Sequence, residues 1–159
     1  MKILLAVDGS LCSDAAISEV ATRPWPIGSS VVILYVVHAR VPQIPDPFFS
    51  LYAAHEQSLE EEQESGQRRV EDAAERIRKN PTIDFVDVET IEGSPKKSIL
   101  KEAGRIAADL VVLGSHGYGV IGRIVRGSVS QAVLSEAHCT VEVIRSPQGP
   151  VLSASRPCN

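Results

Sequence analysis

The chain has 159 residues, of which 43% are hydrophobic and 23% are charged, a balance typical of one folded domain and not of a disordered segment. Its net charge is −4, with 16 basic and 20 acidic side chains spread along the sequence, so we expect no broad positive surface and no nucleic-acid partner. An anionic ligand would have to be held by local backbone donors and a few placed cations, because the overall field of the protein repels it.

The amino-terminal segment and the cysteines indicate a cytoplasmic protein. The chain runs from Lys2 directly into a short apolar segment without a cleavage-site pattern, and no apolar stretch has membrane length. Cys12, Cys139 and Cys158 are an odd number at unrelated spacings, which favours reduced thiols over a disulfide framework. None of their spacings is typical of a zinc site.

Strands and helices are expected to alternate from the start of the chain. The apolar run Lys2–Val7 predicts a buried strand that ends at Asp8-Gly9-Ser10, a turn that also supplies a helix N-cap. A helix over 11–22 follows and ends at Pro24-Trp25-Pro26, because proline cannot continue it. The unbroken β-branched run 31–37 predicts a second strand that is covered on both faces.

The middle of the chain contains an irregular excursion and a long helix. Prolines make 40–49 irregular, and a polar helix is expected over 51–79, with the acidic run 60–62 on its solvated face. The segment 84–91 alternates apolar and polar residues, which predicts a strand with one wetter face near a sheet edge. The narrow apolar stripe of the helix consists of Leu59, Val70, Ala73, Ala74 and Ile77.

The same alternation continues to the end. Pro95 begins an amphipathic helix, 109–113 is the next buried strand, Ser128 begins a last helix and 140–145 forms a last strand. This pattern predicts an α/β fold, a doubly wound five-stranded parallel sheet with helices on both faces. We expect the domain to span 1–146 and 147–159 to form a flexible tail.

The segment richest in glycine joins the fourth strand to the last helix, with five glycines within 114–127. Glycine lets a ligand approach main-chain N–H groups, and such groups at a helix N-terminus form an anion site. The segment is not a P-loop, because the required lysine is missing. The GxGxxG pattern at 117–122 is not read as a dinucleotide fingerprint, since that fingerprint follows the first strand of a sheet.

The spacing G-x2-G-x9-G-S over 114–128 resembles the ATP-binding branch of the universal stress protein family. The resemblance extends over the order of elements to about residue 145, with Asp8 after the first strand and Val36 near the end of the second. It implies a Rossmann-like sheet in the order 3-2-1-4-5. It also implies a cytoplasmic stress-response protein that holds ATP with Mg²⁺ and hydrolyses it slowly or not at all.

The same resemblance implies a set of nucleotide contacts. The phosphates would lie against the glycine-rich segment and the amides and hydroxyls of 128–130, Asp8 near the ribose and indirectly near the metal, and the backbone of Val36 against adenine. No residue is assigned a catalytic role. The nucleotide-binding residues so implied are Asp8, Val36, Gly114, His116, Gly117, Gly127, Ser128, Val129 and Ser130.

Several of these residues also have simpler interpretations. Asp8 is alternatively a turn residue beside a glycine, and the side chain of Val36 is alternatively plain core. His116 has no obvious orienting carboxylate, so we do not read it as a general base. Arg123 and Arg126 either contact phosphate or face water, and the sequence does not decide between these two.

The last strand would lie at an edge of the sheet. Bare edges favour pairing with another strand, and the resemblance implies a homodimer through Val141, Val143 and Ile144, against the alternative that the tail covers this edge. Two other functions stay open, a weak ATP-hydrolysing enzyme and a nucleotide-free protein-interaction module.

Overall fold

The computed structural model describes residues 1–38, 49–115 and 128–146. Within them one five-stranded sheet has the order β3-β2-β1-β4-β5, and every neighbouring pair of strands is parallel. Both the α/β class and the predicted strand order are therefore confirmed. The strands are β1 (Lys2–Val7), β2 (Ser29–Val37), β3 (Ile83–Glu92), β4 (Leu110–Gly114) and β5 (Thr140–Ile144).

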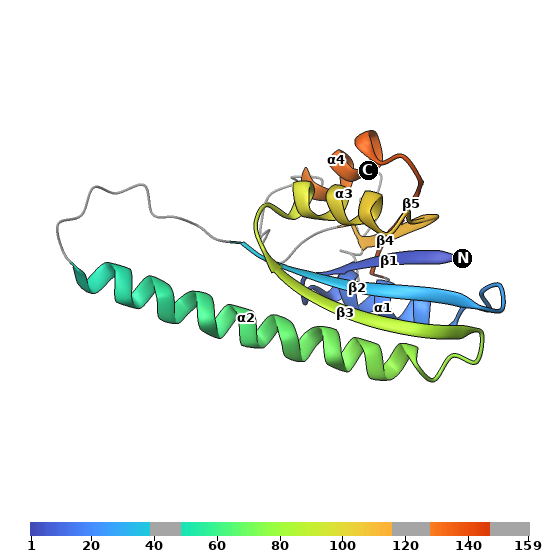
Figure 1. Cartoon of the computed structure of the whole chain (residues 1–159), viewed down its shortest axis with the longest axis horizontal. Coiled ribbons are helices and arrows are strands. Elements are labelled where there is room, and N and C mark those ends of the chain that lie inside the picture. Colours follow the sequence, from blue (N-terminus) through green and yellow to red (C-terminus); the bar gives the residue numbers. More distant parts are fainter. Residues whose placement is uncertain (39–48, 116–127, 147–159) are drawn as a thin grey trace, which may run out of the picture.

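Helices cover both faces of the sheet, with α1 and α2 on one face and α3 and α4 on the other (Figure 1). Right-handed crossovers explain this arrangement, because the chain moves outward from β1 to β3 and then returns past β1 to β4 and β5. The helices in the described residues are α1 (Leu11–Thr22), α2 (Phe49–Ile77), α3 (Pro95–Arg105) and α4 (Ser128–Glu136).

The central strand β1 is buried on both faces. Ile3 and Leu5 belong to the core under α1 and α2, whereas Leu4 belongs to the core under α3 and α4. Successive side chains of a strand point to opposite faces, so a strand that is covered twice needs an unbroken apolar run. The sequence of β1 meets this condition.

Helix α2 packs on the sheet through its predicted stripe and extends past the sheet at its amino-terminal end (Figure 1). Val70, Ala73, Ala74 and Ile77 are buried, and Leu59 packs partly buried against the same core. Although α2 is long, no helix in the described part of the chain is apolar enough over a sufficient length to cross a membrane.

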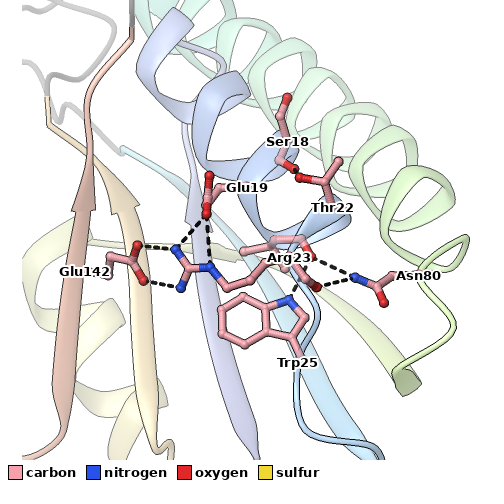
Figure 2. A network of polar contacts seen from close by, with 8 residues as sticks. Ser18, Glu19, Thr22, Arg23, Trp25, Asn80 and Glu142 are labelled. Carbon is pink, nitrogen blue, oxygen red and sulfur yellow. Dashed lines mark hydrogen bonds and ion pairs between the residues drawn. The ribbon is translucent and has the colours of Figure 1, made fainter.

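The edge strand β5 is fastened to α1 by Arg23, the residue that ends this helix (Figure 2). The Arg23 guanidinium donates to both carboxylate oxygens of Glu142, one of them at 2.7 Å, and to Oε1 of Glu19. It also lies 4.7 Å from the centre of the Trp25 ring. These hydrogen bonds lower the pKa of Glu142, so the edge strand is held by a charged pair as well as by its pairing with β4.

Candidate functional site

The carboxyl ends of β1 and β4 lie side by side, at the point where the strand order reverses. Ala6 of β1 pairs with Leu113 of β4. The turn after β1 and Gly114 at the end of β4 therefore follow directly after paired residues on neighbouring strands. From here α1 continues on one face of the sheet and α4 on the other. In open α/β sheets, ligands bind at the carboxyl ends of the strands beside such a reversal of strand order. We call this region the carboxyl edge.

Gly114 brings β4 into contact with the first turn of α1. A Cβ at this position would lie 2.9 Å from the carbonyl carbon and Cβ of Cys12 and from the backbone N of Ser13. Real side chains do not approach so closely, so this contact requires glycine. The first glycine of the predicted motif is therefore held against the start of α1.

The β1–α1 turn, residues 8–10, is closed by its own hydrogen bonds. Oδ1 of Asp8 accepts from the backbone N of Ser10 at 3.0 Å, and the backbone N of Asp8 donates to Oγ of Ser13 at 3.2 Å. Oγ of Ser10 accepts from the backbone N of Ser13 at 3.1 Å, which confirms the expected N-cap. Asp8 is thus a turn residue, and its partly buried carboxylate lies at the carboxyl edge.

Ser115, which the sequence analysis did not single out, links three elements at this edge. Its backbone N donates to the carbonyl of Ile144 at 2.8 Å, and its Oγ lies 3.5 Å from Sγ of Cys12. Its carbonyl accepts from Oγ of Ser130 at 3.4 Å. The start of α4 is thereby drawn to the end of β4, and the only sequence signal for Ser115 is its place directly after a buried strand.

Val36 and Val129 contribute to the core under α3 and α4, where both are partly buried. Val36 pairs with Ile91 of β3 near the carboxyl end of β2. Its side chain is therefore a core side chain, and the adenine contact through its backbone stays a prediction. Ser128 is the first residue of α4.

The other predicted site residues, which lie within the glycine-rich segment, fall outside the described residues, and their roles stay predictions. They are His116, Gly117 and Gly127, together with Arg123 and Arg126.

Helix α2 adds a charged group to this edge that sequence reasoning missed. A Cβ at Gly9 would lie 2.1 Å from Nη1 of Arg69, so the guanidinium occupies the space over the β1–α1 turn. Burial raises the pKa of the Tyr35 hydroxyl, the charges of Glu62 and Asp8 raise it further, and Arg69 lowers it. No pattern indicated Arg69, which is one of two adjacent arginines in a polar helix.

The described residues contain no group of three or more His, Cys, Asp or Glu side chains arranged around a metal ion. Asp8 contributes one carboxylate at the carboxyl edge. Magnesium that accompanies a nucleotide is held by phosphate oxygens and one or two carboxylates. The position of Asp8 fits that indirect role, although it does not form a metal site by itself.

A groove of about 490 Å³ lies at the opposite end of the sheet, between the ends of α3 and α4. Ala108 precedes β4 and Cys139 precedes β5, which places the groove at the amino ends of these strands. It is therefore separate from the carboxyl edge and contributes nothing to the candidate site. Its lining is completed by Leu100, Ala103, Gly104, Ala107, Glu136, Ala137 and His138.

Comparison with known proteins places the chain in a family. The universal stress protein family model matches residues 1–145, and a universal stress protein of Thermus aquaticus is 34% identical over 151 residues, covering 90% of this chain and 97% of the relative. A solved universal stress protein from Lactobacillus plantarum has a TM-score of 0.75 and 25% identity, covering 91% of this chain and 97% of the other.

A universal stress protein family protein from Arabidopsis thaliana, solved with AMP bound, shares the fold with a TM-score of 0.62 and 17% identity, covering 93% of each chain. Since the family model spans almost the whole sequence and the strand order agrees, the chain belongs to the universal stress protein family.

Proposed function

We propose that the chain is a regulatory stress-response protein that binds ATP, together with Mg²⁺, at the carboxyl edge between β1 and β4. The observation that carries this proposal is the contact of Gly114 with Cys12 and Ser13, which brings the start of the G-x2-G-x9-G-S segment beside the turn that contains Asp8. Membership of the family and the AMP-bound plant relative of the same fold support an adenine nucleotide.

The resemblance to the family implies one contact for each part of this edge. The backbone amides of 128–130 belong to the amino-terminal turn of α4, where the helix dipole favours phosphate. Asp8 would face the ribose and the metal, and the backbone of Val36 would meet adenine at the end of β2. We assign no general base, and we therefore expect slow or absent hydrolysis.

The direct test is thermal unfolding with ATP, ADP, AMP or NAD, each with and without Mg²⁺. ATP at a hundred times its Kd should stabilise the fold by about 2.7 kcal/mol, which for a chain of this size raises Tm by about 5–10 °C. No shift with any adenine nucleotide would favour the nucleotide-free interaction module. Release of phosphate from bound ATP would favour the weak enzyme.

Two glycines of the motif provide the matching variants. Gly117→Val and Gly127→Val should abolish the ATP shift while the far-UV spectrum is kept. Gly114 is unsuitable for this purpose, because its substitution pushes α1 off β4. Gly104→Ala, on an open surface of α3, is the control that should keep the ATP-dependent rise in Tm. If Gly117→Val kept the same rise, the glycine-rich segment would not be part of the site.

We also propose a homodimer that pairs the β5 edges of two copies. Among the described strands β5 has one neighbour, β4, and residues 141–144 are all partly exposed. A bare edge with apolar side chains favours strand addition. Sedimentation should therefore show a dimer that Val143→Lys converts to a monomer, and a monomeric unchanged protein at micromolar concentration would contradict this assembly.

A further inference from the structure

The guanidinium of Arg69 rests on the turn that follows β1. Gly9 has a φ of +78°, and a Cβ there would lie 2.1 Å from Nη1, 2.4 Å from Cζ and 2.9 Å from Nε of Arg69. Three atoms of the group crowd the same point, so the planar group lies over the glycine along much of its length. Arg69 is partly buried and is engaged by neighbouring polar or charged groups.

This position follows from the way in which α2 packs on the sheet. One turn before Arg69, Gly66 is buried against Tyr35 of β2, and a Cβ there would lie 2.4 Å from Cδ1 of the ring. Glycine weakens the interior of a helix, so the close approach explains why it stands there. Residues three apart share a helix face, and the approach of Gly66 to β2 therefore carries Arg69 over the carboxyl edge.

Two carboxylates act on the same group as Arg69, the hydroxyl of Tyr35. Asp8 precedes Gly9 in the turn, and Glu62 lies one turn before Gly66 on α2. Together with Arg69, these two carboxylates act on the hydroxyl of Tyr35, whose pKa is raised by burial, by Glu62 and by Asp8 and is lowered by Arg69. If Arg69 were absent, two carboxylates would remain at this edge, in a chain whose net charge is already −4.

We propose that Arg69 sets the charge of the nucleotide site and thereby its preference for highly charged ligands. Its guanidinium partly offsets Asp8 and Glu62, which leaves these three groups at a net charge of −1 instead of −2, so a triphosphate meets less repulsion at this edge. The proposal rests on the proposed nucleotide site and adds a determinant that lies outside the glycine-rich segment. It makes Arg69 responsible for discrimination by ligand charge, separately from the backbone amides of α4.

The test compares Arg69→Gln with the unchanged protein on ligands of rising charge, namely adenosine, AMP, ADP and ATP, by calorimetric titration. ATP affinity should fall about five- to tenfold, as for a partly exposed charge at short range. ADP and AMP should lose less, and adenosine should bind as before. The loss for ATP should shrink at 1 M salt, where the Debye length is about 3 Å instead of about 10 Å at 0.1 M.

Arg68→Gln is a matched control, because it removes the same charge one residue away. The Arg68 side chain is exposed and pairs with Glu64 at 3.6 Å, so its loss should change every affinity by less than about twofold. Arg69→Lys keeps the charge without the planar group and should keep most of the preference for ATP.

Each outcome decides the matter. An equal loss for adenosine and ATP in Arg69→Gln would make Arg69 a brace of the turn and overturn the proposal, as would the same graded loss in Arg68→Gln. If Arg69→Gln does not fold, Arg69→Lys decides, and a lost ATP preference there refutes a role of charge. If the unchanged protein binds none of the four ligands, the proposed function falls together with this role. If the unchanged protein binds these ligands but the loss of affinity in Arg69→Gln does not rise with ligand charge, the proposed function stands and only the role of Arg69 falls.

Discussion

Two glycines should respond to alanine in opposite directions. At Gly114 the added Cβ would come 2.9 Å from three atoms of Cys12 and Ser13, two of which are backbone atoms, so the start of α1 must shift. At Gly104, on the exposed side of α3, nothing lies within 4 Å of such a Cβ. We expect Gly114→Ala to lower the free energy of unfolding by about 1–3 kcal/mol, the range for an overpacked core. Gly104→Ala should raise it by about 0.5–1 kcal/mol, because alanine restricts the unfolded chain.

Urea denaturation followed by circular dichroism measures both free energies by linear extrapolation, provided that the two variants share one m-value. Thermal unfolding checks the same signs, since each kcal/mol moves Tm by about 2–4 °C in a domain of this size. A Gly114→Ala variant as stable as the unchanged protein would refute the contact between β4 and α1. A less stable Gly104→Ala variant would refute the open surroundings of that residue.

Two further predictions concern a charged pair and a helix end. Glu142→Gln should cost about 0.5–1 kcal/mol at neutral pH. Because Arg23 lowers the pKa of Glu142, the pair stabilises the protein above the unfolded carboxyl pKa of about 4.3 and ceases to do so as the pH falls through the lower folded value. Urea titrations should show the difference closing in acid, and a constant difference down to about pH 3 would contradict the pairing. Ala107, which follows the C-cap residue Ile106 of α3, has a φ of 51°, and the next backbone N, of Ala108, donates to the carbonyl of Ala103 at 2.8 Å. Ala107→Gly should therefore raise the free energy of unfolding by about 0.5–1 kcal/mol, whereas Ala108→Gly should lower it. A lower Tm for Ala107→Gly than for Ala108→Gly would exclude left-handed strain at 107.

The parts of the fold that sequence reasoning predicted are those whose signal is local. The continuous apolar runs of β1 and β4 are needed for strands covered on both faces, and their ends fall within two residues of the expected ones. Ser10 caps α1 as expected, because a cap depends on neighbours in sequence. The placement of the motif after the fourth strand follows from the same local signals.

What escaped prediction depends on contacts between distant segments. Gly9, Gly66 and Gly114 matter because they lack a side chain, which lets another segment come close to the backbone. The sequence does not indicate which residue occupies that space. Arg69 was overlooked for this reason. Similarly, the alternation in 84–91 does not reveal that Phe85 is 60% exposed, because the register between β2 and β3 shifts beside it.

The central place of β1 has a consequence for a chain that emerges from the ribosome. Strand β1 can pair with β2 as soon as β2 has been made, but its other side stays bare until Leu110–Gly114 has been translated. The hydrogen bonds between Arg23 and Glu142 form later still, because Glu142 lies 119 residues further along the chain. A chain that ended before β4 would therefore present an apolar strand edge to its neighbours.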